Sequence, residues 1–163
     1  MKITIRSFPA RYRAIIGEDV FLLTENGQLI SDIPEVEVQR ITIHSLSQDP
    51  QLQRSTPISQ DDMYLFGRIL DTWAKEMPEF ALSQIDFYDQ EKEVHLTSRD
   101  TRYILTLTDG RFQLETLAQL VKVEALNTSR QYYIDLRIPA RIYSCDRDRA
   151  ECARNIRNVY GIN

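Results

Sequence analysis

Residues 19–30 carry the signal that constrains the fold of this chain most. Apolar residues fill positions 20–23 and 29–30, and Asn26 and Gly27 lie between these two runs. Asn-Gly suits the two positive-φ positions that a type I′ turn demands. The segment is therefore predicted to form a β-hairpin with a type I′ turn, which commits this part of the chain to a β-sheet.

Further segments alternate polar and apolar residues with the period of a half-buried strand. They cover residues 2–6, 36–44, 81–88 and 133–138. Residues 94–97 and 102–108 are predicted to form the two arms of a further hairpin, with its turn at residues 98–101. Two other segments have helical spacing: one from a cap at Ser59 or Asp61 to Pro78, and one over residues 112–126. Trp73 continues the apolar face of the first helix and is predicted to be buried. Strands interrupted by two helices predict an α+β fold, an antiparallel or mixed β-sheet with two helices packed on it.

Composition narrows the function classes. The 163 residues suit one domain, and no internal repeat is visible. The net charge of −4 argues against a nucleic-acid binder, which needs a basic face. The sequence has no run of about 18 apolar residues, the length that indicates a membrane-spanning helix. The first ten residues do not have the pattern of a signal peptide. None of the five glycines lies in a dinucleotide or P-loop motif.

A search for catalytic or metal-binding patterns predicts none. Asp61 and Asp62 lie where a helix start favours negative charge. His44 and His95 fall in strand patterns, and Cys145 has no histidine near it in the sequence. The two cysteines and two histidines lack the spacing of a zinc site. The sequence therefore predicts no enzyme, no cofactor site and no metal site.

Cys145 and Cys152 leave two alternatives open. If their segment folds back as a loop, a disulfide can form. If the segment is a single helix, the two residues lie about 10.5 Å apart along its axis, beyond the reach of a disulfide. Residues 146–163 form a charge-rich tail that is compatible with a short helix.

The last strand pattern carries a proline. Because proline cannot donate to a β-ladder, Pro139 predicts that residues 133–143 lie at a sheet edge. Ile138, Ala140 and Ile142 are expected to share one face, with Arg137, Arg141 and Tyr143 flanking it on the other. An edge can accept a strand from another chain. Equally, Pro139 and the two arginines can serve to protect the edge from such pairing.

Several of these residues resemble a known family. The run Tyr-Tyr-Ile-Asp-Leu-Arg-Ile-Pro at residues 132–139 is similar to the "YIDLRYP" strand near the end of the FtsQ/DivIB cell-division proteins. The hairpin at residues 21–29 resembles another family segment, and Phe8-Pro9-Ala10 precedes it as in the family. The helices and strands that follow keep the family's order. The resemblance covers residues 1 to about 145.

The resemblance implies an organisation and a role. Residues 1–30 would supply the last part of a POTRA domain and the connecting hairpin, residues 31–145 the β domain, and residues 146–163 the tail. The full-length protein would be tethered to the cell membrane by an N-terminal helix absent here, with these domains on the extracytoplasmic side. The chain would be a non-enzymatic divisome scaffold that binds FtsB- and FtsL-like proteins.

In family members FtsB adds a strand at the end of the β domain. Carried over, the partner-binding residues of this chain would be Tyr133, Arg137, Ile138, Pro139, Ala140, Arg141, Ile142 and Tyr143. Two other readings stay open: a POTRA-like chaperone module of outer-membrane biogenesis or secretion, and a small hydrolase with an unrecognised site.

Overall fold

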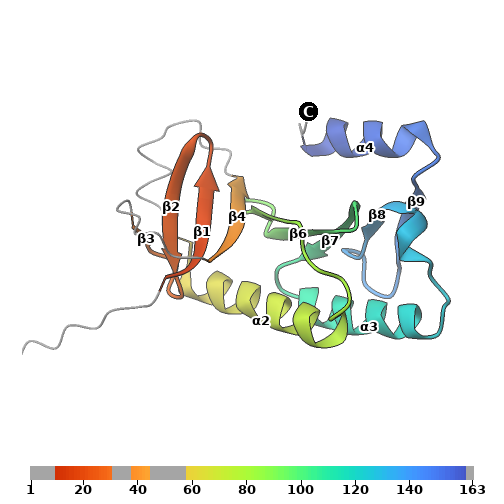
Figure 1. The fold of residues 1–163 in the computed structure, drawn as a ribbon, viewed down its shortest axis with the longest axis horizontal. Coiled ribbons are helices and arrows are strands. Elements are labelled where there is room, and N and C mark those ends of the chain that lie inside the picture. Colours follow the sequence, from red (N-terminus) through yellow and green to blue (C-terminus); the bar gives the residue numbers. More distant parts are fainter. Residues whose placement is uncertain (1–9, 31–37, 45–57, 161–163) are drawn as a thin grey trace, which may run out of the picture.

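A computed structural model describes residues 10–30, 38–44 and 58–160. These residues form one sheet of nine strands, shown in Figure 1. The strands are β1 (Ala10–Ile16), β2 (Asp19–Thr24), β3 (Leu29–Ile30), β4 (Gln39–His44), β5 (Gln84–Tyr88), β6 (Glu93–Ser98), β7 (Thr101–Thr106), β8 (Gln131–Asp135) and β9 (Tyr143–Asp146). The described helices are α2 (Gln60–Glu76), α3 (Gly110–Lys122), η1 (Thr128–Arg130) and α4 (Ala150–Tyr160).

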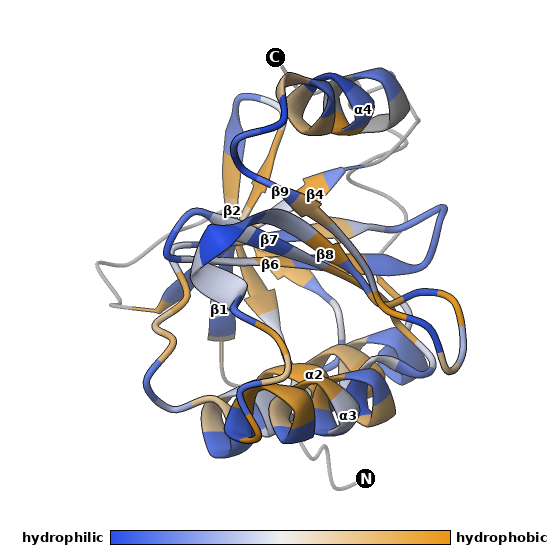
Figure 2. Ribbon diagram, turned by 90° about the vertical axis from the view of Figure 1, so that its right-hand side faces the viewer, coloured by the Kyte–Doolittle hydropathy of each residue, from blue (hydrophilic) through white to orange (hydrophobic). Residues whose placement is uncertain are grey.

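The sheet separates two layers of helices. Helices α2 and α3 lie on one face, called here the inner face, and α4 lies on the opposite, outer face (Figures 1 and 2). The strand order is β3-β2-β1-β4-β5-β6-β7-β8-β9. The pairs β1–β4, β4–β5 and β7–β8 are parallel, and the remaining pairs are antiparallel. Helix α2 connects β4 to β5 and α3 connects β7 to β8, as parallel neighbours require.

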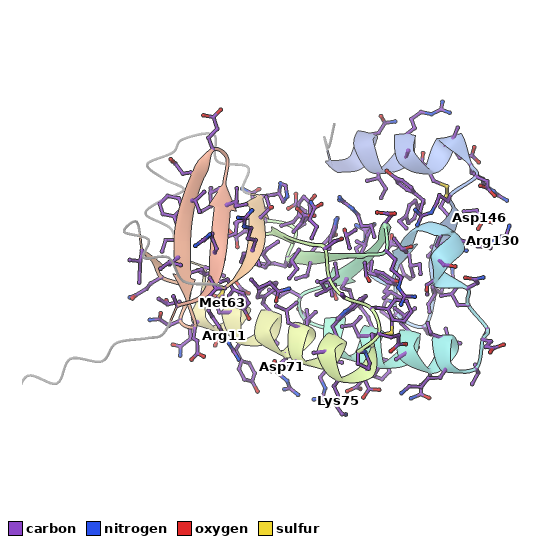
Figure 3. The ribbon with its side chains drawn as sticks, viewed as in Figure 1. Arg11, Met63, Asp71, Lys75, Arg130 and Asp146 are labelled. Atoms are coloured by element: carbon purple, nitrogen blue, oxygen red, sulfur yellow. A yellow bond between two sulfur atoms is a disulfide. The ribbon has the colours of Figure 1, made fainter. Side chains whose placement is uncertain are left out.

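The inner face holds the apolar core. Trp73 is 3% exposed, and its indole packs edge-on against Tyr103 with 4.9 Å between ring centroids. Its Nε1–H donates to the Phe80 carbonyl at 2.7 Å, so the polar end of the ring is also satisfied. Figure 3 shows Asp71 and Lys75 on the side of α2 that points away from the sheet. The predicted burial of Trp73 is confirmed.

The α+β prediction is confirmed, and so are the two helices that were expected to pack on the sheet. Ser59 caps α2 by accepting the Asp62 N–H at 3.0 Å, and the helix ends before Pro78. The charged tail contains α4.

Strand β1 was not predicted, although Tyr12, Ala14 and Ile16 alternate with the right period and are buried. The strand predicted at residues 2–6 lies outside the described residues.

The hairpin at Asn26-Gly27 is confirmed, but its predicted turn type is wrong. Gly27 has φ +82°, whereas Asn26 does not have positive φ. Instead, Thr24 and Gln28 close a longer loop. The Thr24 N–H donates to the Gln28 carbonyl at 3.0 Å, and the Gln28 N–H donates to the Thr24 hydroxyl oxygen at 3.0 Å. The Thr24 hydroxyl also lies 3.2 Å from the Gln28 carbonyl. A two-residue turn with positive φ at both positions occurs at Arg99-Asp100, between β6 and β7.

The domain boundary that the resemblance implies at residue 30 does not coincide with a break in the sheet. Strand β1 pairs with β4 across that boundary, from Tyr12↔Gln39 to Ile15↔Thr42. Residues on both sides of it therefore share one sheet and one core. Within the described part of the chain, no helix is long and apolar enough to cross a membrane.

Candidate partner-binding surface

The prediction of one edge strand over residues 133–143 is wrong. Strand β8 ends at Asp135 and is paired on both sides, in parallel with β7 and antiparallel with β9. Pro139 lies in the connection between β8 and β9 and not in a strand. Among the described residues, the edge strand at this end of the sheet is β9 (Tyr143–Asp146), the last in the strand order. The edge therefore exists, but it lies further along the chain than predicted.

Local hydrogen bonds explain why the chain turns after Asp135. The Asp135 carboxylate accepts a hydrogen bond from the backbone N–H of Arg137 at 3.1 Å. This N–H therefore bonds to a side chain in a local turn and not to a neighbouring strand. Further on, the Arg141 N–H donates to the Ile138 carbonyl at 3.1 Å. Ala140 has φ +58°, a left-handed conformation that ends any strand. The predicted alternation of Ile138, Ala140 and Ile142 on one strand face therefore does not occur.

The backbone of β9 presents Ser144 to the outside. Leu136 N–H donates to the Ile104 carbonyl in β7 at 2.9 Å, so the backbone groups of Leu136 and Ile134 point toward β7. Successive residues of a strand point their backbone groups to opposite sides, so those of Tyr133 and Asp135 point toward β9. Their partners Cys145 and Tyr143 must point back toward β8. The N–H and C=O of Ser144, between them, consequently face away from the sheet.

An apolar groove lies beside this edge. It has a volume of about 590 Å³ and runs between α3 and the connection from β8 to β9. Phe112, Thr116 and Leu120 line it from α3, and Leu136 and residues 138–142 line it from the connection. Phe112 is 70% exposed and Ile138 is 48% exposed, although both are large apolar side chains.

The structure groups the predicted partner-binding residues into three places. Ile138, Pro139, Ala140, Arg141 and Ile142 line the groove, and Tyr143 opens β9. Tyr133 lies in β8, opposite Cys145. Arg137 is bound within the chain: its guanidinium makes a bidentate contact with Asp135 at 2.7 and 2.9 Å and a 2.8 Å ion pair with Glu93.

Sequence reasoning missed Ser144, Phe112 and Asp109. Ser144 was not named as a binding residue, because the predicted edge strand ended at Tyr143. Phe112 could have been noticed, since it does not share the apolar face of Leu114, Leu117 and Ala118 on the second helix. Asp109 lines the same groove and could not have been found from spacing alone.

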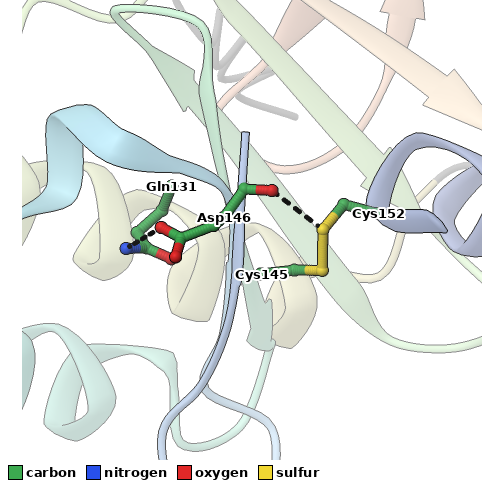
Figure 4. Close-up of a disulfide and its surroundings, with 4 residues drawn as sticks. All are labelled: Gln131, Cys145, Asp146 and Cys152. Carbon is green, nitrogen blue, oxygen red and sulfur yellow. Dashed lines mark hydrogen bonds between the residues drawn. A yellow bond between two sulfur atoms is a disulfide. The ribbon is translucent and has the colours of Figure 1, made fainter. Parts of the chain in front are cut away.

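A disulfide joins Cys145 in β9 to Cys152 in α4, with 5.7 Å between their Cα atoms (Figure 4). The segment folds back between them, so the looped alternative holds. The Sγ of Cys152 also lies 3.0 Å from the Asp146 carbonyl oxygen. Because a disulfide sulfur carries no hydrogen, this is a close contact and not a donated hydrogen bond. The disulfide fixes the start of α4 to the edge strand.

The turn that leads to α4 is also hydrogen-bonded to the end of the sheet. Arg147 N–H donates to the Arg130 carbonyl at 2.9 Å, and the Arg147 guanidinium donates to the Gln131 carbonyl and to Thr101 Oγ1 at 3.2 Å each. Gln131 in turn donates to the Asp146 carboxylate at 3.1 Å. Figure 3 shows Arg130 and Asp146 close together at this corner of the molecule.

The outer face of the sheet carries a row of ionisable side chains, called here the polar ladder, which crosses β4 to β8. Its members are His44, Asp86, Arg102, His95, Glu93, Arg137 and Asp135. His44 Nε2 donates to Asp86 at 3.0 Å, and Arg102 lies 3.8 Å from the same carboxylate. His95 is fully buried.

The ladder fixes the proton positions of His95. An arginine N–H can only donate, so His95 Nδ1 accepts from Arg102 at 3.4 Å, and Nε2 carries the proton that it donates to Glu93 at 3.4 Å. Burial lowers the pKa of His95, and the charge of Arg102 lowers it further against the opposing pull of Glu93. His95 is therefore a neutral bridge in the ladder.

The pKa values of Asp86 and Tyr88 are shifted in opposite directions. Burial by itself would raise the pKa of Asp86, but hydrogen bonds from His44 and Gln84 and the charge of Arg102 outweigh it and lower that pKa. Burial, together with the Asp86 charge, raises the pKa of Tyr88 to about 12. The carboxylate is thus held ionised by its neighbours. Among the described residues, no group of three or more His, Cys, Asp or Glu side chains is arranged to hold a metal ion.

No protein-family model matches the sequence of this chain, and no curated protein matches it.

Proposed function

We propose that this chain is a non-enzymatic scaffold of the bacterial cell-division complex, located on the extracytoplasmic side of the membrane. It binds FtsB- and FtsL-type proteins by strand addition, and the receiving strand is β9. The resemblance of residues 132–139 to the FtsQ/DivIB proteins supplies the identity of the partners. The observation that carries the mode of binding is the outward-facing N–H and C=O of Ser144 in β9, which pairs with β8 alone among the strands of the described residues.

Two further features support the proposal. Disulfides persist mainly in oxidising compartments, so the Cys145–Cys152 bond fits a protein that lies outside the cytoplasm. The bond also attaches β9 to α4, which orders the strand before a partner arrives. A strand that is ordered in advance loses less conformational entropy on binding, and binding is correspondingly tighter.

A POTRA-like chaperone is the alternative function. A POTRA unit places two helices in succession in a βααββ order. Helices α2 and α3 are instead separated by β5, β6 and β7. The strand addition at β9 would serve either function, but the helix order favours the scaffold.

The test uses Ser144→Pro, compared with Ser144→Ala. Proline removes the outward N–H and adds a ring on the side where a partner strand would pair, and edge strands tolerate proline when that side faces solvent. Alanine keeps the N–H. We expect Ser144→Pro to weaken binding of the extracytoplasmic region of the FtsB-type protein from the same organism at least about tenfold, since a lost ladder bond and a steric clash together exceed about 1.4 kcal/mol.

Isothermal titration with the oxidised proteins measures this difference, and circular dichroism confirms that both variants are folded. The Arg141 position is unsuitable for the same test, because its N–H closes the turn onto Ile138 and is not at the edge. Equal affinities for Ser144→Pro and Ser144→Ala, with both variants folded, would contradict strand addition at β9.

A further inference from the structure

The disulfide is attached to the strand that the proposed function uses. Cys145 follows Ser144 in β9 and pairs with Tyr133 in β8. Strand β9 has four residues, and within the described part of the chain β8 is the one strand that pairs with it. A strand this short, with a single neighbour, depends on further contacts to stay ordered. The bond to α4 is such a contact, and it lies one residue away from the outward-facing backbone groups of Ser144.

The same bond contributes little to the rest of the molecule. Cys145 and Cys152 are seven residues apart, and the entropy that a cross-link removes from the unfolded chain is small for a short loop. The apolar core lies on the inner face of the sheet, opposite α4 (Figure 2). Reduction of the bond therefore affects β9 and α4 locally and leaves the inner face folded.

The two sulfur atoms differ in their access to a reductant. Cys152 is fully buried, whereas Cys145 is partly exposed. Thiol–disulfide exchange begins when a thiolate attacks one of the two sulfurs, so a thiolate from outside reaches Cys145 Sγ first. The leaving sulfur is then that of Cys152, the third residue of α4, and a helix N-terminus stabilises a thiolate.

Reduction also gains a hydrogen bond that the oxidised state lacks. Cys152 Sγ lies 3.0 Å from the Asp146 carbonyl oxygen (Figure 4). No hydrogen lies between these atoms in the disulfide, but the Cys152 thiol of the reduced protein can donate to this oxygen. Contacts that stabilise the reduced form make a disulfide easier to reduce.

The turn between the two cysteines makes the reaction reversible. The Arg149 N–H donates to the Asp146 carbonyl at 3.1 Å, and the Cys152 N–H donates to the Arg149 carbonyl at 3.1 Å. Neither hydrogen bond involves a sulfur atom, so both can persist after reduction. They keep the two thiols close together, and the bond can form again without refolding of the chain.

We propose that the Cys145–Cys152 disulfide is a redox-controlled lock on the partner-binding strand, and that its reductant is a protein dithiol. The first thiolate of the dithiol attacks Cys145 Sγ and displaces Cys152 as a thiolate, which takes up a proton. The second thiol of the dithiol then attacks the mixed disulfide and releases Cys145, which is protonated in turn. Two electrons pass to the chain, both cysteines become thiols, and the dithiol becomes a disulfide.

The lock controls binding through the order of β9. With the bond formed, β9 is ordered and ready to accept a strand. With the bond broken, β9 is ordered for part of the time, and the apparent affinity falls in proportion to that fraction. The choice of the FtsB-type protein as the partner rests on the proposed strand addition, whereas the lock itself rests on the contacts of Cys145 and Cys152.

Isothermal titration of the full chain with the extracytoplasmic region of the FtsB-type protein tests the lock, before and after reduction with dithiothreitol. We expect reduction to weaken binding about tenfold, as when β9 is ordered in about one molecule in ten. The double variant Cys145→Ala, Cys152→Ala is the matched control. It should bind like the reduced wild type with or without dithiothreitol, because it has no bond to break.

A second measurement needs no partner. Hydrogen–deuterium exchange should show that reduction speeds the exchange of the Cys145 amide, which faces β8, and leaves the amides of β6 unchanged. Mass spectrometry after alkylation confirms that both cysteines are reduced. If the bond resists dithiothreitol until urea unfolds the protein, the lock is wrong.

The two measurements together separate the lock from the proposed function. If the FtsB-type protein binds equally well to the oxidised and reduced chains, or β9 exchanges at the same rate in both, the lock is overturned and strand addition is kept. If that protein binds neither form while reduction still speeds exchange in β9, the choice of partner is overturned and the lock on this edge is kept.

Discussion

The two faces of this sheet are stabilised in different ways. The inner face is an apolar core in which Phe66, Trp73 and Tyr103 pack between α2, α3 and the strands. The outer face relies on the polar ladder and on α4, whose described side chains bury only Cys152 and Ile156. Apolar packing is insensitive to pH and to reducing agents, whereas a histidine bridge and a disulfide are not. The comparison therefore predicts that one side of the molecule responds to its chemical environment and the other does not.

The largest effect is expected from the inner face. Trp73→Ala removes an indole that is packed against Tyr103 and leaves the Phe80 carbonyl without its donor. Large-to-small substitutions of this kind cost about 3–5 kcal/mol in the free energy of unfolding. Chemical denaturation followed by circular dichroism measures the loss. A midpoint unchanged from the wild type would show that the inner face is not the main source of stability.

The first helix and the hairpins could be predicted because local patterns determine them. Ser59, the apolar face that includes Trp73, and Pro78 give α2 a start, a buried side and an end within one short stretch of sequence. The same applies to β6 and β7, which were predicted as the two arms of a hairpin and pair from Glu93↔Thr106 to Ser98↔Thr101 around Arg99-Asp100. The two residues of that turn gave no type I′ signal, since neither is glycine or asparagine.

The end of the sheet could not be predicted from alternation alone. Residues 133–138 alternate as a strand does, but the Asp135 side chain competes for the Arg137 N–H, and the strand ends there. The polar ladder was missed for a different reason. His44, Asp86, His95 and Arg102 are distant in sequence, and only the strand order β4-β5-β6-β7 brings them into one row. The groove likewise depends on the placement of α3 beside the connection from β8 to β9.

The second effect concerns the attachment of α4 to the outer face. The double variant Cys145→Ala, Cys152→Ala loses a cross-link between residues seven apart, worth about 2.5 kcal/mol in the chain-entropy estimate. A helix of 11 residues is marginal by itself, and α4 buries few side chains. We expect its amides to exchange with solvent much faster in the variant, while the amides of α2 keep their protection.

Hydrogen–deuterium exchange measures both helices in one experiment. Wild-type protein treated with dithiothreitol is the control, since it should reproduce the exchange of the double variant without any substitution. Equal protection of α4 in the oxidised and reduced proteins would mean that the hydrogen bonds of Arg147 hold the helix without the disulfide.

The smallest effect is expected from pH, and it also distinguishes the two faces. Burial keeps the pKa of His95 below its ordinary value of 6.5, so as pH falls the unfolded chain takes up a proton before the folded chain does. The unfolded state is then favoured, and stability decreases as pH falls through and below about 6.5. The lowered pKa of Asp86 acts in the same direction, but only below its ordinary value of 3.8.

His95→Gln tests this origin of the pH dependence. Glutamine does not titrate, and its amide offers one acceptor for Arg102 and one donor for Glu93, as neutral His95 does. We expect urea denaturation between pH 7 and pH 5 to show a decline in stability for the wild type and for Trp73→Ala, but a flatter profile for His95→Gln. Trp73→Ala serves as the control because it weakens the inner face and leaves the polar ladder intact. If His95→Gln keeps the full wild-type decline, the dependence arises elsewhere, and the outer face does not have the pH sensitivity that sets it apart from the inner one.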